Sequence, residues 1–549
     1  MEPHDGQTLD QLAKPNDKPI FMRTDVDDTN HNQPSEPEGI AENGKHPLKP
    51  HPLEDLFPKL DTSKLLSLDE QFPAGNEIKS LLKRVDMALA KNGACYGNRD
   101  STIMGFPGTC VHPVARLIMA KLVGEHANHI GMHTNQTSED GFAGTQALER
   151  EAIETIAGWL GDERADGYFT PGGTEANNMG MWIGRNYLWR NFGDPTDPRI
   201  CVITSILGHY SIIKGTDLLN LGLCGDTPAF DGSGLHKIPC DSFGAISHFG
   251  YDRRRKESQN PITCMRQLIE RNFDRGIRRF LIVLTAGTSH TGGVDHIESI
   301  CDMLQDVIKV NPKLGVYVHV DAAHGGFIGP FMEEPIQVGF AHKLVSSVTV
   351  DPHKMGFAPY PAGLFLARQG LPGTYISRPV GYIGSHVDNT ISGSRSGAAA
   401  VAVWGLLKFL GFDGYKRIVK YLLELTNRIR EILKKHEGLY LYESELNIIA
   451  FTIDNPEFHH ILVDQKNNRS LTQEKLKIIE AYNAFRKKYC LPGEELPTYL
   501  DDPNSLKRQV HKIVVMPHAW VLERCDEALE VFDQDLTELL GIIKKNTTH

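Results

Sequence analysis

Short apolar runs, each followed by a polar or glycine-rich segment, recur through the middle of the chain. Four of them are Ile200–Thr204, Phe280–Leu284, Val316–Val320 and Ser346–Val350, whose β-branched and aliphatic residues predict strands. Apolar residues ahead of the first run recur at helical spacing: Leu148, Ala152, Ile156, Trp159 and Leu160. Strands that alternate with helices predict a mixed, mainly parallel α/β sheet between about residues 116 and 400.

The segments on either side of this region have a different pattern. Residues 1–60 are rich in Pro, Asp, Asn and His, and predict a flexible polar arm, with a regulatory or dimer-clasping arm as the alternative. Residues 61–115 contain apolar residues that predict a helical segment. Residues 116–400 would form a large cofactor-binding domain. An apolar helix that begins at Gly397 leads into residues 401–549, a smaller domain.

The smaller domain contains segments with the pattern of strands and segments with the pattern of helices. Residues 449–453 and 512–516 predict strands, and residues near 471–490 and 525–545 predict helices. We therefore expect an α+β fold for residues 401–549.

Composition narrows the class of protein. A chain of 549 residues with 40% apolar and 23% charged residues has room for two or three globular domains. The net charge of -11 argues against nucleic acid or an anionic membrane as a partner. Nine scattered cysteines without a Cys-x-x-Cys pair suggest neither a disulfide framework nor a zinc ribbon, and fit a reducing, cytoplasmic compartment. No run of about 18 apolar residues predicts a membrane span, and the first residues lack secretory features.

Two of the predicted strands end in residues that suit an amine-binding cofactor. Val316–Val320 is followed by Asp321, and Ser346–Val350 is followed by Asp351, Pro352, His353 and Lys354. A lysine amine can form a Schiff base with the aldehyde of pyridoxal 5′-phosphate, and a carboxylate can keep the ring nitrogen protonated. A single lysine after a strand is usually a solvated surface group, so this inference depends on the rest of the pattern.

Further polar groups follow other predicted strands and helices. The glycine-rich turn Thr170–Asn178 leads into a helical run, where backbone N–H groups and the Thr174 hydroxyl could hold a phosphate, or the glycines could only shape a turn. His209 follows Ile200–Thr204 and could stack on a pyridine ring or be structural. Ligand sites in α/β sheets lie at the carboxyl ends of strands, so these groups are expected to meet.

Together these motifs resemble the group II pyridoxal-phosphate-dependent amino-acid decarboxylases, and look most like the tyrosine/aspartate decarboxylase branch. The resemblance rests on six segments: Gly173–Asn177, His209–Ser211, Gly287–Thr288, His319–Ala323, Asp351–Gly356 and Ser394–Gly397. It implies the α/β fold type I of PLP-dependent transferases, which is aspartate aminotransferase-like, with a seven-stranded-type sheet. It also implies pyridoxal 5′-phosphate as cofactor and a homodimer whose sites are built at the subunit interface, where the helical segment 61–115 would lie.

The resemblance implies a role for each matching position. Lys354 would carry the Schiff base, and Asp321 would pair with the ring nitrogen. His209 would stack on the ring, and Ala323 would support its opposite face. The other cofactor contacts would be Gly173, Thr174, His353 and Asp351 around the phosphate and Thr288 near the phenolic oxygen.

The family also uses a tyrosine on a mobile loop to protonate the substrate carbon after CO2 is lost. The segment Leu371–Gly384 is rich in Gly and Pro, fits a lid, and contains Tyr375 and Tyr382. Tyr382 is preferred because its distance from Ser394 along the chain is closer to the family pattern, although either tyrosine could be an interface aromatic. Thr134 and Asn135 lie in a loop where the family places substrate contacts, and are candidates for substrate binding.

Two other groups have competing interpretations. His126, His129 and His133 have a spacing that could suggest a metal, but His-Glu-x-x-His is absent and no cysteine joins them, so no metal site is predicted. Arg395 could clamp a carboxylate or phosphate, and a structural ion pair is favoured.

Three functional hypotheses follow. The leading one is decarboxylation of an L-amino acid, tyrosine or a related aromatic, with aspartate or glutamate as the alternative. The second is carbon–carbon lyase chemistry of the sphingosine-1-phosphate lyase type. The third is a binding protein that has lost its cofactor, and the intact set of Lys354, Asp321, His209 and Gly173 argues against it.

Overall fold

The computed structural model describes residues 51–58, 76–89, 101–108, 110–125, 127–134, 141–222, 231–248, 260–382, 387–500 and 502–547. Within this part, Pro52–His549 forms one compact unit. Residues 1–50 of the predicted polar arm, Asn135, His126 and most of residues 59–100 lie outside the described residues.

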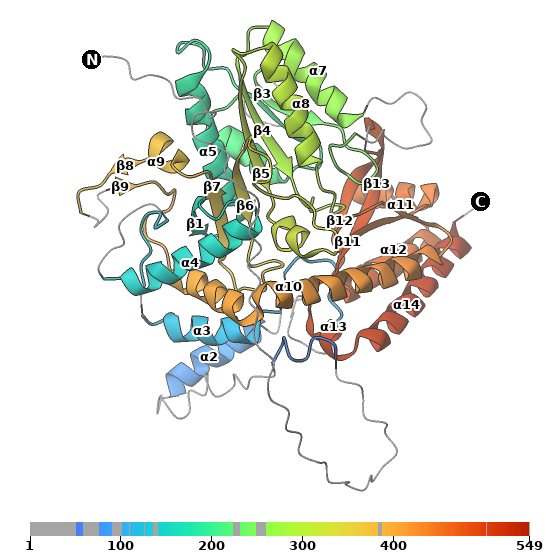
Figure 1. Ribbon diagram of the computed structural model, residues 1–549. Coiled ribbons are helices and arrows are strands. Elements are labelled where there is room, and N and C mark those ends of the chain that lie inside the picture. The colour runs from blue at the N-terminus through green and yellow to red at the C-terminus, as the bar shows by residue number, and fades with distance from the viewer. Residues whose placement is uncertain are drawn as a thin grey trace, which may run out of the picture. The chain divides into compact units, whose positions relative to one another are not determined.

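A seven-stranded sheet forms the centre of the unit (Figure 1). Its strand order is β1-β7-β6-β5-β4-β2-β3. The strands are β1 Asp166–Thr170, β2 Cys201–Ser205, β3 Gly234–Ile238, β4 Arg279–Thr285, β5 Gly315–Asp321, β6 Val345–Val350 and β7 Gly363–Ala367. Strands β3, β2, β4, β5 and β6 are parallel, whereas β7 runs antiparallel to both β6 and β1. The mainly parallel sheet expected from the sequence is confirmed.

Helices cover both faces of this sheet, because alternate residues of each strand point to opposite sides. In β4, Leu281 and Val283 belong to a cluster with residues of α5, whereas Phe280 and Ile282 belong to the main core with residues of α7 and α8. The helices of this region are α3 Pro113–Leu122, α4 Ala143–Trp159, α5 Gly173–Asn191, α6 Tyr210–Leu218, α7 Pro261–Asp274, α8 Ile297–Val310 and α9 Leu371–Tyr375, and α2 Asn76–Leu89 precedes them.

A second, antiparallel sheet lies in the C-terminal part, in the order β10-β11-β13-β12. Its strands are β10 Leu439–Leu441, β11 Ile448–Ile453, β12 Gly493–Tyr499 and β13 Asp502–Val514. The helices are α11 Pro456–Lys466, α12 Gln473–Lys488, α13 Ala519–Glu523 and α14 Cys525–Asn546. The predicted strands and helices are present, while β10 and β12 were not anticipated.

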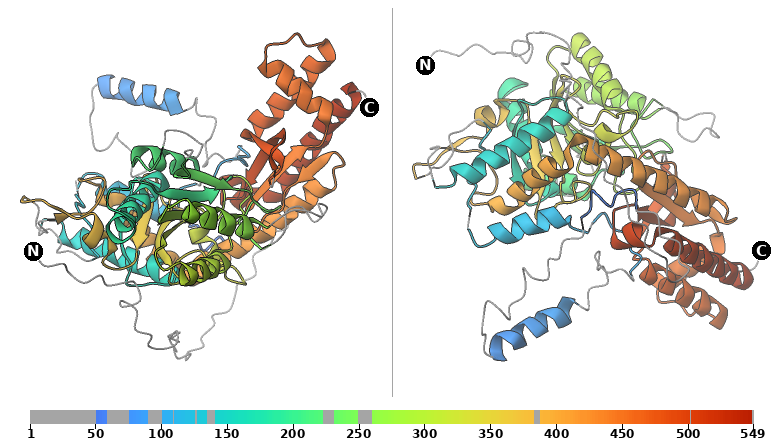
Figure 2. Two further views of the ribbon diagram at one scale, coloured as in Figure 1. Left: turned by 90° about the horizontal axis from the view of Figure 1, so that it is seen from above. Right: turned by 60° about the horizontal axis from the view of Figure 1, so that its bottom comes forward.

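Helix α10, Gly397–Lys434, contacts α3 and α4 at one end and β10, β11 and α14 at the other (Figure 2). Gly411 interrupts it with a left-handed φ of 58°. In the described part of the chain it is the one helix long and apolar enough to cross a membrane. Of the 18-residue stretch that meets this condition, 67% is buried inside the fold. Packing against the core therefore accounts for its apolar character.

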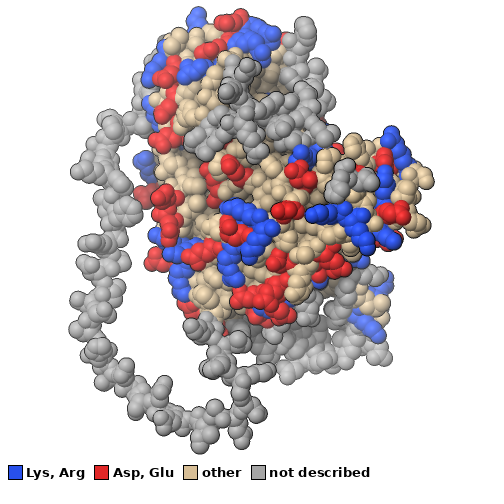
Figure 3. Space-filling model, turned by 90° about the vertical axis from the view of Figure 1, so that its right-hand side faces the viewer, with Lys and Arg blue, Asp and Glu red and all other residues tan. Residues whose placement is uncertain are grey.

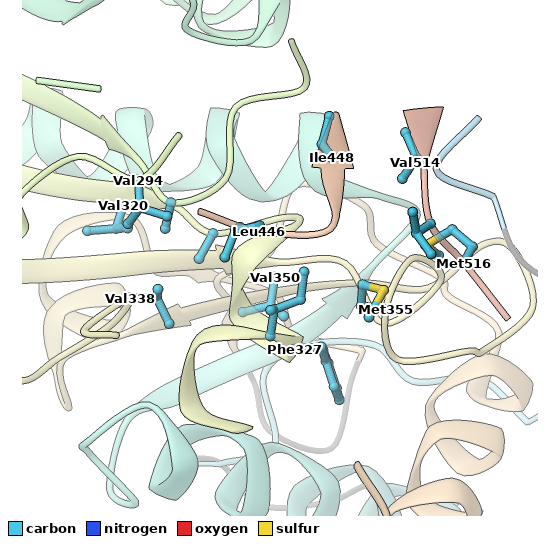
Figure 4. Packing of buried hydrophobic residues seen from close by; sticks show 14 of the residues in the cluster. Val294, Val320, Phe327, Val338, Val350, Met355, Leu446, Ile448, Val514 and Met516 are labelled. Carbon is cyan, nitrogen blue, oxygen red and sulfur yellow. The ribbon is translucent and has the colours of Figure 1, made fainter. Parts of the chain in front are cut away.

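The two sheets meet through an apolar core. Figure 4 shows Val350 and Met355, from the end of β6 and the turn after it, in the same cluster as Leu446, Ile448, Val514 and Met516 from the C-terminal part. This packing brings β11 and β13 next to the carboxyl ends of the central strands. Outside the core, Figure 3 shows acidic and basic side chains interspersed on one face of the molecule. Surface ion pairs of the protein include Arg428–Asp526 at 2.6 Å.

Candidate active site

A cavity of about 280 Å³ lies at the carboxyl ends of the central strands. Eight of the residues singled out from the sequence line it: Gly173, Thr174, His209, Asp321, Ala323, Asp351, His353 and Lys354. They come from the first turn of α5, from the turns after β2 and β6, and from the end of β5 and the turn after it. The structure brings together groups that are far apart in the chain, as the strand ends predicted.

The lysine at the cavity wall is held by an ion pair. Lys354 Nζ lies 3.0 Å from Oδ2 of Asp351, whose side chain is buried. Burial lowers the pKa of Lys354, but the carboxylates of Asp351 and Asp321 outweigh it, so its pKa lies above the ordinary value. Nε2 of His353 lies 3.6 Å from the same Asp351 oxygen, while its Nδ1 donates to the Ala362 carbonyl at 2.7 Å. The other Asp351 oxygen, Oδ1, is buried without a hydrogen-bonding partner.

The second carboxylate, Asp321, has both oxygens engaged. Oδ1 accepts from the Ala323 N–H at 3.1 Å, and Oδ2 accepts from Nδ2 of Asn177 at 2.8 Å. These two bonds come from β5's own turn and from helix α5. Asp321 is therefore held in one orientation facing the cavity it lines.

The amino end of helix α5 opens on the same cavity. Its first residues, Gly173 and Thr174, line the cavity, and the preceding Gly172 caps the helix without any side-chain hydrogen bond. A Cβ on Gly173 would lie 2.9 Å from Asp351 Oδ2, so only glycine allows this close approach. The first N–H groups of a helix have no partner within the helix, and they attract anions.

The imidazole of His209 stands at the start of helix α6. Its Nδ1 accepts from the Ser211 N–H at 3.3 Å and lies 2.8 Å from the Ser211 hydroxyl. Burial lowers its pKa, while Asp321 acts in the opposite direction. A neutral ring with a fixed orientation can pack against a flat ligand in the cavity.

Two predicted contacts, Thr288 and Thr134, do not line this cavity, and a third lies outside the described residues. Thr288 is fully buried, and its Oγ1 accepts from the Gly293 N–H and lies 3.0 Å from Thr291 Oγ1, so the turn itself uses the hydroxyl. Thr285, at the end of β4, lines the cavity instead. Thr134 Oγ1 accepts from Gly167 N–H at 3.1 Å and thereby supports β1. Asn135 lies outside the described residues.

The two loop tyrosines differ in their surroundings, and neither lines the cavity formed by this chain. Tyr375 packs edge-on against Tyr187 with the ring centroids 5.4 Å apart, and its hydroxyl accepts from Asn191 at 2.9 Å. Tyr382 is 89% exposed and follows the short strand β8 Arg378–Pro379, which pairs with β9 Val387–Asp388. Tyr375 is thus packed against α5, whereas Tyr382 is exposed among the described residues.

Arg395 takes part in a buried structural cluster. Its guanidinium donates to the Gly131 carbonyl at 3.0 Å, pairs with Glu149 at 3.3 Å and covers the ring of Tyr168. Glu149 also pairs with His129 at 2.5 Å. Burial raises the pKa of Glu149, but Arg395 and His129 outweigh it and bring the pKa down to about 2. Across the described ranges no group of three His, Cys, Asp or Glu side chains is arranged to hold a metal, and His126 lies outside them.

Comparison with known proteins agrees with this arrangement. The conserved domain described as "Pyridoxal-dependent decarboxylase conserved domain" matches residues 241–454. A tryptophan decarboxylase of Clostridium sporogenes is 32% identical over 391 residues, which are 71% of this chain and 83% of that protein. A probable L-tyrosine/L-aspartate decarboxylase of Methanothermobacter thermautotrophicus is 30% identical over 353 residues, or 64% and 82% of the two chains.

The chain belongs to the group II pyridoxal-phosphate-dependent amino-acid decarboxylases. The expected family, near the tyrosine/aspartate branch, is confirmed, and so is pyridoxal 5′-phosphate as cofactor. L-Methionine decarboxylase from Streptomyces sp. 590 has a similar structure, with a TM-score of 0.62, 19% identity, and coverage of 88% of this chain and 98% of that one. At that identity the likeness shows the fold, which is fold type I as expected.

The cavity of this decarboxylase fits the cofactor. The uncapped amino end of α5 and the Thr174 hydroxyl suit a phosphate, and Lys354 offers an amine for an aldehyde. Asp321 supplies an anion on the same cavity, as a protonated pyridine nitrogen requires. The donor set and the close approach at Gly173 therefore fit the phosphate, the aldehyde and the ring nitrogen of pyridoxal 5′-phosphate.

Three further side chains of the decarboxylase line the cavity and were not singled out from the sequence: Lys512, His324 and Tyr360. Lys512 lies on β13, where its Nζ donates to the Ser289 carbonyl at 2.8 Å. Burial lowers its pKa, with Glu494 acting against that and Lys354 adding to it. A lysine in an otherwise apolar stretch, Ile513–Met516, was the available signal.

His324 and Tyr360 line the same cavity as Lys354, from the segments after β5 and β6. Nε2 of His324 is 2.7 Å from Oδ1 of the buried Asn447, and burial lowers the pKa of His324 to about 4. The ring of Tyr360 packs on His353 with centroids 4.2 Å apart. Neither residue stands out by local pattern, because each reaches the cavity through the path of its loop.

Proposed function

We propose that this decarboxylase acts on an L-amino acid with an aromatic side chain and releases the corresponding amine and CO2. L-Tyrosine is the first candidate. One observation carries the choice. The lysines and arginines among the described cavity-lining residues are Lys354 and Lys512. Lys354 is committed to the cofactor, so one cation is left for the substrate's α-carboxylate and none for an acidic side chain.

The apolar part of the lining supports the same choice. Pro107, Leu207, Ile448 and Val514 border the cavity, and they offer the kind of surface on which an aromatic ring is buried. L-Aspartate is the second candidate, because relatives near this branch carry that name. It would require a further cation from outside the described lining.

We assign Lys354 to the covalent attachment of the cofactor. Pyridoxal 5′-phosphate, when bound, supplies an aldehyde for amines and a ring that accepts electrons from the substrate carbon. The Asp351 carboxylate keeps the lysine at the cavity wall, with its Oδ2 3.0 Å from Nζ, the nitrogen that must lose a proton. Gly173, Thr174 and His353 would hold the phosphate.

We assign Asp321 to the ring nitrogen, His209 to one ring face and Ala323 to the other. A carboxylate fixed by two hydrogen bonds keeps the nitrogen proton in place without reorganisation. Replacing Asp321 by Ala would therefore damage the chemistry more than cofactor retention. We further assign Lys512 to the substrate α-carboxylate, which has to be held while its bond to the α-carbon breaks.

We retain Tyr382 as the proton donor to the α-carbon, acting between the subunits of a homodimer. Its 89% exposure and its position after a two-residue strand support a role outside its own chain's core. The homodimer, the cytoplasmic location and the division into domains at residues 60, 115 and 400 stay proposals. Size measurement by light scattering tests the first of these.

The decisive experiment is a substrate panel. The full chain loaded with cofactor is incubated with L-tyrosine, L-tryptophan, L-aspartate and L-glutamate, and amine and CO2 are quantified, with Lys354→Ala as control. Tyramine or tryptamine formed only by the wild type supports the proposal. β-Alanine or γ-aminobutyrate as the main product would refute the aromatic substrate, and no CO2 from any of the four amino acids would also count against it.

A further inference from the structure

A stripe of polar residues runs through the apolar sheet beneath the cavity. In β5, Tyr317, His319 and Asp321 occupy alternate positions and so share one face. On the neighbouring strand β6, Ser347 lies opposite His319 in the sheet register. Tyr317, His319 and Ser347 are at most 1% exposed. Burying such groups is costly unless each one is hydrogen-bonded.

These groups are bonded to one another in a continuous chain. The Tyr317 hydroxyl donates to Ser347 Oγ at 2.9 Å, and Ser347 Oγ lies 2.8 Å from Nδ1 of His319. Nε2 of His319 lies 3.0 Å from Oδ1 of Asn177 and 3.2 Å from Oγ1 of Thr349. The Asn177 amide nitrogen then donates to Asp321 at 2.8 Å.

The direction of every bond in the chain is determined. A carboxylate only accepts, so the NH2 group of Asn177 faces Asp321 and its carbonyl oxygen faces His319. Nε2 of His319 must then donate. Burial lowers the pKa of His319 to about 4, so the ring is neutral near pH 7 and Nδ1 accepts from the Ser347 hydroxyl. All donors therefore point towards Asp321, and bonds in such a chain strengthen one another.

The chain forks at Asn177. The same amide nitrogen that donates to Asp321 also donates to Ser211 Oγ at 2.9 Å. Because Ser211 Oγ accepts there, its own proton is directed to Nδ1 of His209, 2.8 Å away. One buried amide thus reaches the two cavity residues assigned to the cofactor ring, Asp321 and His209.

Close packing keeps this amide in place. A Cβ on Gly180 would lie 2.3 Å from Nδ1 of His319, so the absence of a side chain there lets helix α5 approach β5 closely enough for Asn177 to bond with His319. An apolar replacement of the whole stripe would avoid the cost of burying polar groups. That the fold retains a fully bonded polar chain ending at Asp321 points to a role at the cavity.

We propose that Asn177 is a positioning residue: its amide sets the orientation of the Asp321 carboxylate and of the His209 ring together, and the chain Tyr317–Ser347–His319 holds the amide in that orientation. This inference rests on the proposed roles of Asp321 and His209. Asn177 would act on the bond between Asp321 and the cofactor's ring nitrogen, and through Ser211 on the packing of His209.

The test measures affinity of the full-length apo protein for pyridoxal phosphate and for its 1-deaza analogue, in which a carbon replaces the ring nitrogen. Asn177→Ala should weaken binding of the natural cofactor about tenfold or more, the effect of losing a hydrogen bond to a buried charge. It should weaken the deaza analogue much less, because that ring has no nitrogen proton for Asp321. A purely structural defect would weaken both alike.

Asn272→Ala is the matched control. Asn272, on helix α7 at the other face of the sheet, is also a fully buried amide, and it contacts Cys201 and the Gly232 carbonyl without lining the cavity. Asn272→Ala should not weaken the binding of one ligand more than the binding of the other. Equal losses for the two ligands in Asn177→Ala, or no loss, would overturn the proposal.

Ser211→Ala removes a single oxygen and tests the other branch of the fork. It should weaken both ligands to a similar extent, and this loss should disappear in a His209→Ala background, since Ser211 acts through His209. A loss that persists there would overturn that branch. If Asp321→Ala itself shows no preference between the ligands, the assigned role of Asp321 fails. If Asp321→Ala is selective and Asn177→Ala is not, only the inference about Asn177 fails.

Discussion

Nζ of Lys354 and Oδ2 of Asp351, three residues earlier in the chain, lie 3.0 Å apart at the wall of the cavity. This ion pair keeps the lysine protonated, because Asp351 and Asp321 together outweigh the effect of burial on its pKa. An amine must be neutral to attack an aldehyde. The pair therefore both positions Lys354 and delays its reaction with the cofactor.

Replacing Asp351 by Asn should lower the pKa of Lys354, because burial lowers this pKa and one of the two carboxylates that raise it is then removed. Imine formation between the apo protein and pyridoxal phosphate, followed by absorbance, should consequently begin at a lower pH than in the wild type. Asp302→Asn, at an exposed position, serves as control. An unchanged pH midpoint in Asp351→Asn would contradict the role of the ion pair.

Lys512→Met should raise the KM for the amino-acid substrate by roughly ten- to a hundredfold, the range for a buried hydrogen bond to a charged group. The product amine lacks the carboxylate, so its inhibition constant should change little. Steady-state kinetics with substrate and product measure both. Lys507→Met, at an exposed position on the same strand β13, should leave both constants unchanged. Equal weakening of substrate and amine would show that Lys512 does not bind the carboxylate.

Asp295 gives the protein a pH-dependent stability. Burial raises its pKa from 3.8 to about 7, although the Ile246 and Thr285 N–H groups donate to it. Because the pKa is raised in the folded state, its stabilising contribution is complete below about pH 4 and is lost as the pH rises towards 7. One pKa unit corresponds to about 1.4 kcal/mol, so the full loss is roughly 4 kcal/mol.

Asp295→Asn should therefore flatten the fall in melting temperature between pH 5 and pH 8, measured by thermal unfolding. The variant loses an acceptor for one of the two N–H groups, which lowers its stability at every pH and does not affect the slope. A slope equal to that of the wild type would show that Asp295 does not titrate in this range.

Gly180→Ala should destabilise the protein by about 1–3 kcal/mol, because the added Cβ would meet His319 in a packed interior. Gly541→Ala is the matched change in helix α14, where a Cβ meets nothing within 4 Å. There we expect a gain of about 0.5–1 kcal/mol, since alanine favours helix. Denaturant unfolding compares the two, and a gain of stability in Gly180→Ala would refute the close approach.

Much of the cavity could be located from sequence, because its parts follow local patterns. Asp321 and Lys354 each follow an apolar run, and parallel strands place their carboxyl ends at one edge of a sheet. The glycine-rich turn before α5 is equally local. Cavity-lining positions for Asp321, Lys354, His209 and Gly173 were predictable for this reason, whereas their chemical roles remain proposals.

Other placements depend on contacts between distant segments. The Thr288 hydroxyl bonds within its own turn, and Tyr375 packs against Tyr187 on α5; the positions of these residues in the sequence do not indicate either contact. Lys512 reaches the cavity because the C-terminal sheet packs against the turn after β6 through residues such as Met355 and Val514. No spacing in the sequence indicates that packing.

The sequence by itself determined the mainly parallel sheet, the family and the cofactor, because strand periodicity and short motifs are local properties of the chain. Only the tertiary structure decided which side chains form hydrogen bonds with the cavity residues. Asn177 and Asp321 are 144 residues apart, and their hydrogen bond exists because helix α5 lies against β5 at the one distance that Gly180 allows. Hydrogen bonds require ångström-scale approach, and the packing of whole elements sets that approach.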